Sequence, residues 1–141
     1  MLEVTIYHNP ACGTSRNTLA LLIHAGLHPT VIEYLKTPPS KETLKSLLAR
    51  MKIGVRDLLR HKGTPYQELQ LDLPKWSDEE LIDFMLAYPI LMNRPIVITD
   101  LGVKLCRPSE KVLSILPIPQ IAPFTKEDGE VLQDSGARDH I

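Results

Sequence analysis

Hydrophobic and polar residues follow a strand-like pattern near both ends of the chain and a helical period between them. Residues 2–7 and 30–35 are rich in β-branched and aromatic side chains, which predicts two strands. Residues 14–25 show a helical period. Three apolar residues share the predicted buried face of this helix: Leu19, Leu22 and Ile23. A strand, a helix and a strand within about 35 residues predict a parallel, right-handed βαβ unit.

The middle of the chain is dominated by helical signals. Ser40 can cap a helix whose apolar residues recur at helical spacing: Leu44, Leu47, Leu48 and Met51. Residues 55–61 indicate a short helical segment, and Ser77 with Glu80 forms a capping box before another helix. Residues 36–89 therefore predict a helical insertion without a strand.

Strand signals return after this insertion. Residues 96–99 and 103–106 predict two strands, and Asp100-Leu101-Gly102 between them fits a three-residue hairpin with a left-handed glycine. Residues 109–116 predict a last core helix, and Thr125 can start a short terminal helix.

The order βαβ, helical insertion, ββα resembles the thioredoxin-like fold, an α/β class with a mixed four-stranded sheet. In such folds the first strand-to-helix turn carries a reactive cysteine. A proline before the third strand, here Pro95, commonly follows a cis bond and faces that cysteine. We expect one domain over residues 1–141 that divides into three parts: a core at about 1–35 and 90–116, a helical insertion at about 36–89, and a C-terminal tail at 117–141.

Composition narrows the possible functions. The chain has 141 residues and a net charge of −1, which argues against a nucleic-acid partner that needs a basic field. We expect no membrane partner and a cytoplasmic location, because the sequence shows neither a secretory signal nor a span of about 20 apolar residues. His24 and His28 are separated by the helix-ending Gly26, so no metal is expected. Trp76 and Phe84 are expected in the core of the insertion.

Cys12 lies between a predicted strand and a predicted helix, in the loop HNPACGTSR. Free backbone N–H groups and the helix dipole favour a thiolate there, and the thiol pKa of about 8.5 can fall to about 3.5–7.5. Gly13 allows a tight turn, Ser15 can donate a hydroxyl hydrogen bond to the sulfur, and a protonated His8 would add positive charge. The alternative is an inert core cysteine, but the polar neighbours favour a nucleophile.

Two related types of cysteine site are excluded by single residues. Ser15 replaces the second cysteine of a C-x-x-C pair, and Thr18 stands where a C-x5-R phosphatase loop requires arginine. An outside thiol is therefore expected to resolve the Cys12 sulfur, with Cys106 as the alternative. Cys106 is otherwise expected to be a core cysteine of a strand.

Arginines near predicted loop and strand ends are candidates for binding a tetrahedral oxyanion. A guanidinium stays charged and offers planar, bidentate donors. The three candidates are Arg60, Arg94 and Arg107. Each could equally be a solvated surface charge, so their joint value depends on the fold. Arg16 and Arg56 are expected to face solvent or to pair with carboxylates.

Four blocks of the sequence closely resemble the glutaredoxin-dependent arsenate reductases (the ArsC family). They occur in the order of that family and cover essentially the whole chain: HNPACGTSRNTL at 8–19, NRPIVIT at 93–99, LCRPSE at 105–110 and FTKEDGE at 124–130. Arg60 lies in a further matching segment, VRDLLR.

The resemblance implies a function and a role for each site residue. Cys12 would be the nucleophile, His8 would lower its pKa, and Ser15 would assist. The three arginines named above would bind arsenate and later intermediates. Glutathione would be the co-substrate and glutaredoxin the partner, with no bound cofactor or metal. Arsenate would be reduced to arsenite through a covalent bond between Cys12 and arsenic, as in arsenic detoxification.

Two other functions stay open at this point. Redox-sensing transcriptional regulators of the same superfamily dock on RNA polymerase, but those that sense oxidation often carry the C-x-x-C pair that Ser15 removes. A general thiol oxidoreductase would act on disulfides, but such an enzyme has no need of three arginines.

Overall fold

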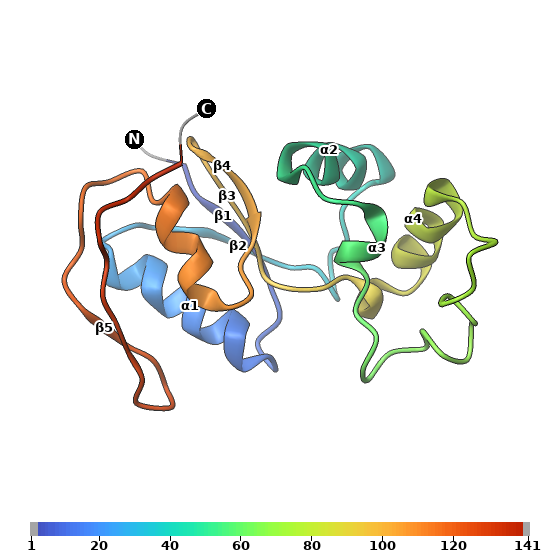
Figure 1. The fold of residues 1–141 in the computed structure, drawn as a ribbon, viewed down its shortest axis with the longest axis horizontal. Helices are drawn as coiled ribbons and strands as arrows, with labels where there is room; N and C mark the ends of the chain where they lie inside the picture. The colour runs from blue at the N-terminus through green and yellow to red at the C-terminus, as the bar shows by residue number, and fades with distance from the viewer. Residues whose placement is uncertain (1–2, 140–141) are drawn as a thin grey trace. The chain divides into compact units, whose positions relative to one another are not determined.

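Residues 3–139 are described by the computed structural model, and they divide into two units (Figure 1). The first unit combines residues 3–33 with residues 94–139, and the second comprises residues 34–93. Leu2, at the start of the first predicted strand, lies outside the described residues.

The first unit is built on a four-stranded mixed sheet in the order β2-β1-β3-β4. Its strands and the crossover helix have these bounds: β1 Thr5–His8, α1 Gly13–His24, β2 Thr30–Glu33, β3 Ile96–Thr99 and β4 Gly102–Leu105. β1 pairs with β2 in parallel and with β3 antiparallel, and β3 pairs antiparallel with β4. The predicted thioredoxin-like sheet is confirmed.

The hairpin between β3 and β4 is shorter than predicted. Thr99 pairs with Gly102, so the connection has two residues and Gly102 belongs to β4. Its φ of 154° is positive, which favours glycine over residues with a side chain. The prediction of a three-residue loop is therefore wrong, while the requirement for glycine is confirmed.

The core of the first unit lies where α1 and a 3-10 helix, η2 (Ser109–Ile115), pack together on the sheet (Figure 1). Its fully buried side chains come from both layers: Ile6, Leu21, Leu22, Val97 and Val112. Ile23 was expected in this core but is 59% exposed. The buried face of α1 instead includes Ser15 and Thr18 beside Leu21 and Leu22.

The predicted last core helix is a 3-10 helix over residues 109–115 and not an α-helix. Its last carbonyls accept hydrogen bonds from outside the segment. The Thr99 hydroxyl donates to the Ile115 carbonyl, and the Asp139 N–H donates to the Ser114 carbonyl. These hydrogen bonds satisfy backbone carbonyls that would accept from the next helical turn if the segment were a longer α-helix.

The second unit contains three α-helices and a 3-10 turn, and the predicted absence of a strand from residues 36–89 is confirmed. The second predicted strand, residues 30–35, is shorter than expected, because β2 ends at Glu33. The elements are α2 Lys41–Met51, α3 Val55–Leu58, α4 Asp78–Ala87 and η1 Pro89–Leu91. Both predicted caps are confirmed. The Ser40 hydroxyl accepts from the Thr43 N–H, and Ser77 with Glu80 forms the capping box of α4.

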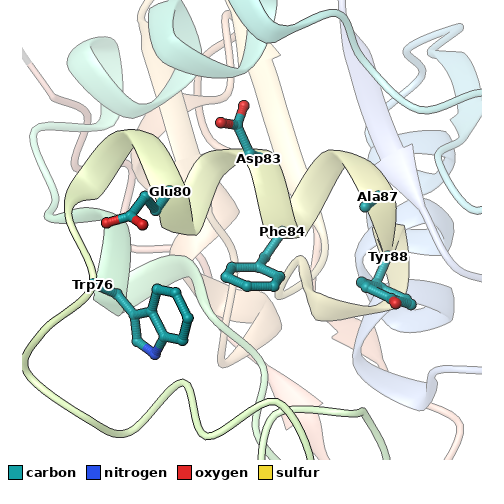
Figure 2. Close-up of a pocket in the computed structure, with 6 residues that line it drawn as sticks. All are labelled: Trp76, Glu80, Asp83, Phe84, Ala87 and Tyr88. Atoms are coloured by element: carbon teal, nitrogen blue, oxygen red, sulfur yellow. The ribbon is translucent and has the colours of Figure 1, made fainter.

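The two large aromatic residues of the second unit are only half-buried, which corrects their expected core position. The rings of Trp76 and Phe84 meet edge to face at 5.0 Å. Figure 2 shows them with Tyr88 along one side of α4, where they line an open pocket of about 330 Å³. Leu81 and Met85 fill the core beneath this helix instead.

The predicted terminal helix at Thr125 is absent. Phe124–Thr125 (β5) and Val131–Leu132 (β6) form a small antiparallel hairpin. Its turn is closed by the Lys126 N–H, which donates to the Glu130 carbonyl. Gly129 supplies a φ of 92°, which a β-carbon would disfavour.

Near the C-terminal end of the described residues, Asp134 and Arg138 form a largely buried ion pair. Asp134 accepts two hydrogen bonds from Arg138, at 3.0 and 2.9 Å, and two from the backbone N–H groups of Ile121 and Gly136. The Arg138 guanidinium, together with these amides, holds the pKa of Asp134 far below its usual range against the opposing effect of burial.

Replacing Asp134 with asparagine is expected to destabilise the fold by about 3 kcal/mol near pH 7, because a partly buried guanidinium loses its charged partner. The unfolded carboxyl has a pKa of about 3.9, so its contribution is full above that pH and is lost as the pH falls through the lower folded pKa. Urea unfolding at several pH values measures both effects. Glu79→Gln, whose exposed carboxylate pairs with Lys41 and Lys45, is the control and should leave the unfolding midpoint nearly unchanged.

Candidate active site

Cys12 occupies the N-cap position of α1, at the end of a tight loop that follows β1. Its N–H donates to the Asn9 carbonyl at 3.0 Å, and the Asn9 side-chain oxygen accepts from the Ala11 N–H at 2.9 Å. These two bonds fix the loop from within. The side chain of Cys12 is therefore held at the start of the helix, where backbone N–H groups converge.

Two predicted arginines lie at this cysteine. Nη1 of Arg107 is 3.6 Å from Sγ of Cys12 and 3.1 Å from the Arg94 carbonyl oxygen. Arg94 and Arg107 each precede a proline across a cis bond. Because β3 and β4 are antiparallel, the residue before β3 and the residue after β4 lie at the same edge of the sheet.

The environment of Cys12 favours its thiolate. Burial raises the pKa of the thiol, but four favourable interactions outweigh it and leave the pKa below its ordinary value. They are the Ser15 backbone N–H, the charge of Arg94, and both the hydrogen bond and the charge of Arg107.

Ser15 and His8 meet each other rather than the sulfur. Oγ of Ser15 lies 2.6 Å from Nδ1 of His8 and accepts from the Asn9 N–H at 3.0 Å. The expected hydroxyl hydrogen bond from Ser15 to Cys12 is thus replaced by contact with His8. Both residues are buried, so the pair braces the end of β1 against the start of α1.

The charge expected on His8 is not favoured by its surroundings. Burial lowers the pKa of His8 and the Arg16 guanidinium lowers it further, while Glu33 opposes them. A neutral His8 can accept a hydrogen bond at Nδ1 from the Ser15 hydroxyl. The contact of His8 that the structure gives at this site is the one with Ser15, and the role of His8 toward Cys12 stays a prediction.

Arg60, the third predicted oxyanion ligand, belongs to the second unit. Its Nε donates to the Lys62 carbonyl at 3.1 Å, and its backbone N–H donates to the Leu91 carbonyl at 2.8 Å. Its side chain is half-buried in the turn that follows α3. Its role toward an anion stays a prediction.

Arg16 and Arg56 were expected to face solvent or to pair with carboxylates. Arg16 forms a bidentate pair with Glu127, at 2.8 and 3.1 Å, which confirms pairing with a carboxylate. Arg56 is exposed, as expected, although its guanidinium donates to the carbonyls of Leu71 and Leu73. Glu127 and Asn9 are residues at this site that the sequence did not single out, because their contacts depend on loop geometry.

Cys106 is a core residue. It is fully buried among apolar side chains, and desolvation raises its pKa to about 12. At that pKa the thiolate is essentially absent near neutral pH. The interpretation of Cys106 as a buried structural cysteine is supported over that of a resolving thiol.

The two cysteines are expected to differ sharply in alkylation. Near pH 7, iodoacetamide should label Cys12 at least about 100-fold faster than Cys106, because the pKa of Cys12 is lowered whereas Cys106 is fully buried with a pKa raised to about 12. Peptide mass spectrometry of the native protein measures both rates, and labelling in denaturant provides the reference in which both react. Comparable rates in the native protein would contradict the assignment.

Residues 3–139 contain no group of three or more histidine, cysteine or acidic side chains placed to hold a metal ion. This part of the chain also contains no helix with the length and apolar character needed to cross a membrane.

A thioredoxin-like unit with a lowered-pKa cysteine at its first strand-to-helix turn, beside two arginines, has the organisation of a thiol-dependent enzyme. The chain belongs to the ArsC family, whose model matches residues 7–115.

Similar proteins extend over nearly the whole chain. An arsenate reductase from Escherichia coli is 62% identical over 139 residues, which are 98% of this chain and 99% of that protein. One from Rhizobium meliloti is 58% identical over 137 residues, 97% and 98% of the two chains. The solved structure of an arsenate reductase from Vibrio cholerae has a TM-score of 0.78 and 45% identity, covering 82% of this chain and 98% of that one.

Proposed function

We propose that this protein reduces arsenate to arsenite in the cytoplasm, with glutathione as co-substrate and glutaredoxin as partner, and so detoxifies arsenic. The observation that carries the proposal is the contact between Nη1 of Arg107 and the Cys12 sulfur, at 3.6 Å. The pKa of the Cys12 thiol is lowered in the same surroundings. Arsenate reductases that are 58% and 62% identical to this chain over nearly its whole length support arsenate as the substrate.

In the first step, the Cys12 thiolate attacks arsenic. A sulfur–arsenic bond forms, an arsenic–oxygen bond breaks, and the departing oxygen leaves as water after protonation. Arg94 and Arg107 compensate negative charge on the remaining oxygens, because guanidinium groups present charged donors at the position where the nucleophile lies. Arg60 is proposed as a further ligand of the same oxyanion.

The second step brings in the external thiol. The glutathione sulfur displaces a second oxygen as water and gives a Cys12–S–As–S–glutathione adduct. A glutaredoxin thiolate then attacks the glutathione sulfur. The arsenic–sulfur electron pair stays on arsenic, which becomes trivalent, and a glutaredoxin–glutathione disulfide forms. Water finally releases arsenite and restores the Cys12 thiolate.

An outside thiol is required because the protein has no suitable second thiol near neutral pH. Ser15 occupies the position of the second cysteine in a C-x-x-C pair, and Cys106 is fully buried with a raised pKa. Phosphate has the same charge and shape as arsenate, so it should compete for the arginines. It is a dead end because thiols do not reduce it.

The test is NADPH oxidation coupled through glutathione reductase, glutathione and glutaredoxin. The rate should depend on arsenate, and thioredoxin should substitute poorly. Phosphate should inhibit without supporting turnover. With glutaredoxin omitted, reduction of hydroxyethyl disulfide that depends on this protein, together with no response to arsenate in the complete assay, would instead identify a general thiol oxidoreductase.

A further inference from the structure

The turn of the C-terminal hairpin, residues 126–130, lies against the start of α1, far from it in sequence (Figure 1). The Glu127 carboxylate pairs with Arg16, and the Glu127 N–H donates to the Asn17 side-chain oxygen at 3.0 Å. On the other side of the turn, Nζ of Lys126 lies 3.3 Å from the Glu110 carboxylate of η2. The turn is thus fixed between two elements of the first unit.

The Arg16 side chain connects this hairpin turn to the cysteine loop. While Nε and Nη2 hold Glu127, Nη1 donates to the Pro10 carbonyl at 2.9 Å. Pro10 stands two residues before Cys12, inside the loop whose other bonds run through Asn9. The guanidinium therefore connects the hairpin turn to the backbone that positions the sulfur.

Glu127 also lies directly over the residue that follows Cys12. A β-carbon at Gly13 would come within 3.2 Å of Oε1 of Glu127 and 3.7 Å of Nη2 of Arg16. A side chain at position 13 would therefore press on the Glu127 carboxylate, which would have to shift by a few tenths of an ångström. Both charged side chains are about half exposed, at 45% and 48%, so their pairing contributes little to global stability.

We propose that Glu127 and Arg16 are positioning residues for Cys12: the hairpin carboxylate orients the guanidinium, and the guanidinium holds the Pro10 carbonyl and with it the cysteine loop. In this arrangement Arg16 is a loop brace, distinct from the arginines that face the substrate. The inference rests on the proposed function only where turnover is measured, because loop position also governs the reactivity of Cys12 toward other electrophiles.

The central variant is Glu127→Ala. It should lower kcat/KM for arsenate about 10-fold through loss of loop geometry, leave the KM for glutaredoxin unchanged, and slow alkylation of Cys12 by iodoacetamide. Glu127→Gln keeps an oxygen that can accept from Arg16 and should restore most of both rates. An alanine variant with wild-type turnover and alkylation, or a glutamine variant as impaired as alanine, would overturn the proposal.

A double-mutant cycle tests whether the two residues act as one unit. Arg16→Ala should resemble Glu127→Ala, and the double variant should be no worse than either single variant. Additive losses in the cycle would refute a shared action. Glu130→Ala is the matched control, because Glu130 lies in the same turn and pairs with Lys126 at 3.4 Å, away from the cysteine loop. Its two rates should equal those of the wild type.

The alkylation measurement separates the two proposals. If the wild type fails to reduce arsenate but Glu127→Ala still slows labelling of Cys12 and glutamine restores it, the proposed function fails and the positioning role stands. If arsenate is reduced and labelling is indifferent to all these variants, the positioning role fails alone. Thermal unfolding midpoints within about 2 °C of the wild type show that each variant is folded.

Discussion

Cys12→Ser is expected to abolish arsenate reduction, with a loss of at least about 1,000-fold. A serine hydroxyl at this position is essentially protonated near neutral pH, whereas the surroundings of Cys12 lower the thiol pKa. Serine also cannot form the sulfur–arsenic bond from which the electron pair is later left on arsenic. The coupled NADPH assay measures the loss, and mass spectrometry tests for a missing arsenic adduct.

The matched control for this variant is Cys106→Ser, the other cysteine of the chain. It should keep arsenate turnover per folded molecule, because Cys106 lies in the core with a pKa of about 12. A buried hydroxyl in an apolar core should lower stability, so the unfolding midpoint should fall even as the rate is kept. Substantial turnover by Cys12→Ser would refute the assignment of the nucleophile.

The position of the site could be predicted because it follows from strand order. His8 ends β1, Arg94 precedes β3, and Arg107 follows β4. In a sheet where β3 is antiparallel to both β1 and β4, these three positions share one edge. Cys12 comes to the same edge because it directly follows β1 at the start of the crossover helix.

The contacts within the site could not be predicted in the same way. Ser15 stands three residues after Cys12, a spacing that suggested a hydroxyl bond to the sulfur, but its rotamer directs Oγ toward His8. Glu127 is 111 residues from Arg16 in sequence. Its hairpin has strands of only two residues, which is too short for an alternating pattern to be recognised.

The helices show the same division between local and tertiary information. The caps at Ser40 and Ser77 are local interactions, and the structure contains both. The exposure of Ile23, by contrast, depends on which side of α1 packs on the core, because Leu21 and Leu22 of the same turn are fully buried. The apolar period of a helix identifies a candidate face, but tertiary packing decides which residues at its margin are covered.

Arg107→Ala is expected to lower kcat/KM for arsenate by about 10-fold to 100-fold, the range for losing a charged hydrogen bond of about 1.5–3 kcal/mol. It removes the guanidinium that lies 3.6 Å from the sulfur and holds the Arg94 carbonyl. The pKa of Cys12 should rise, because two of the interactions that lower it come from Arg107. The thiolate fraction at a given pH should then fall, so the alkylation profile should move to higher pH.

Arg107→Lys separates charge from geometry in this prediction. Lysine keeps a positive charge, so it should keep part of the shift in the Cys12 pKa, but it cannot donate in parallel to two oxygens of one anion. We therefore expect an alkylation profile closer to the wild type than that of alanine, while arsenate turnover stays impaired. Arg50→Ala, at an exposed position of α2, is the control and should match the wild type in both. Wild-type arsenate kinetics in Arg107→Ala would show that the guanidinium beside the sulfur does not bind arsenate. Other residues would then have to bind the substrate.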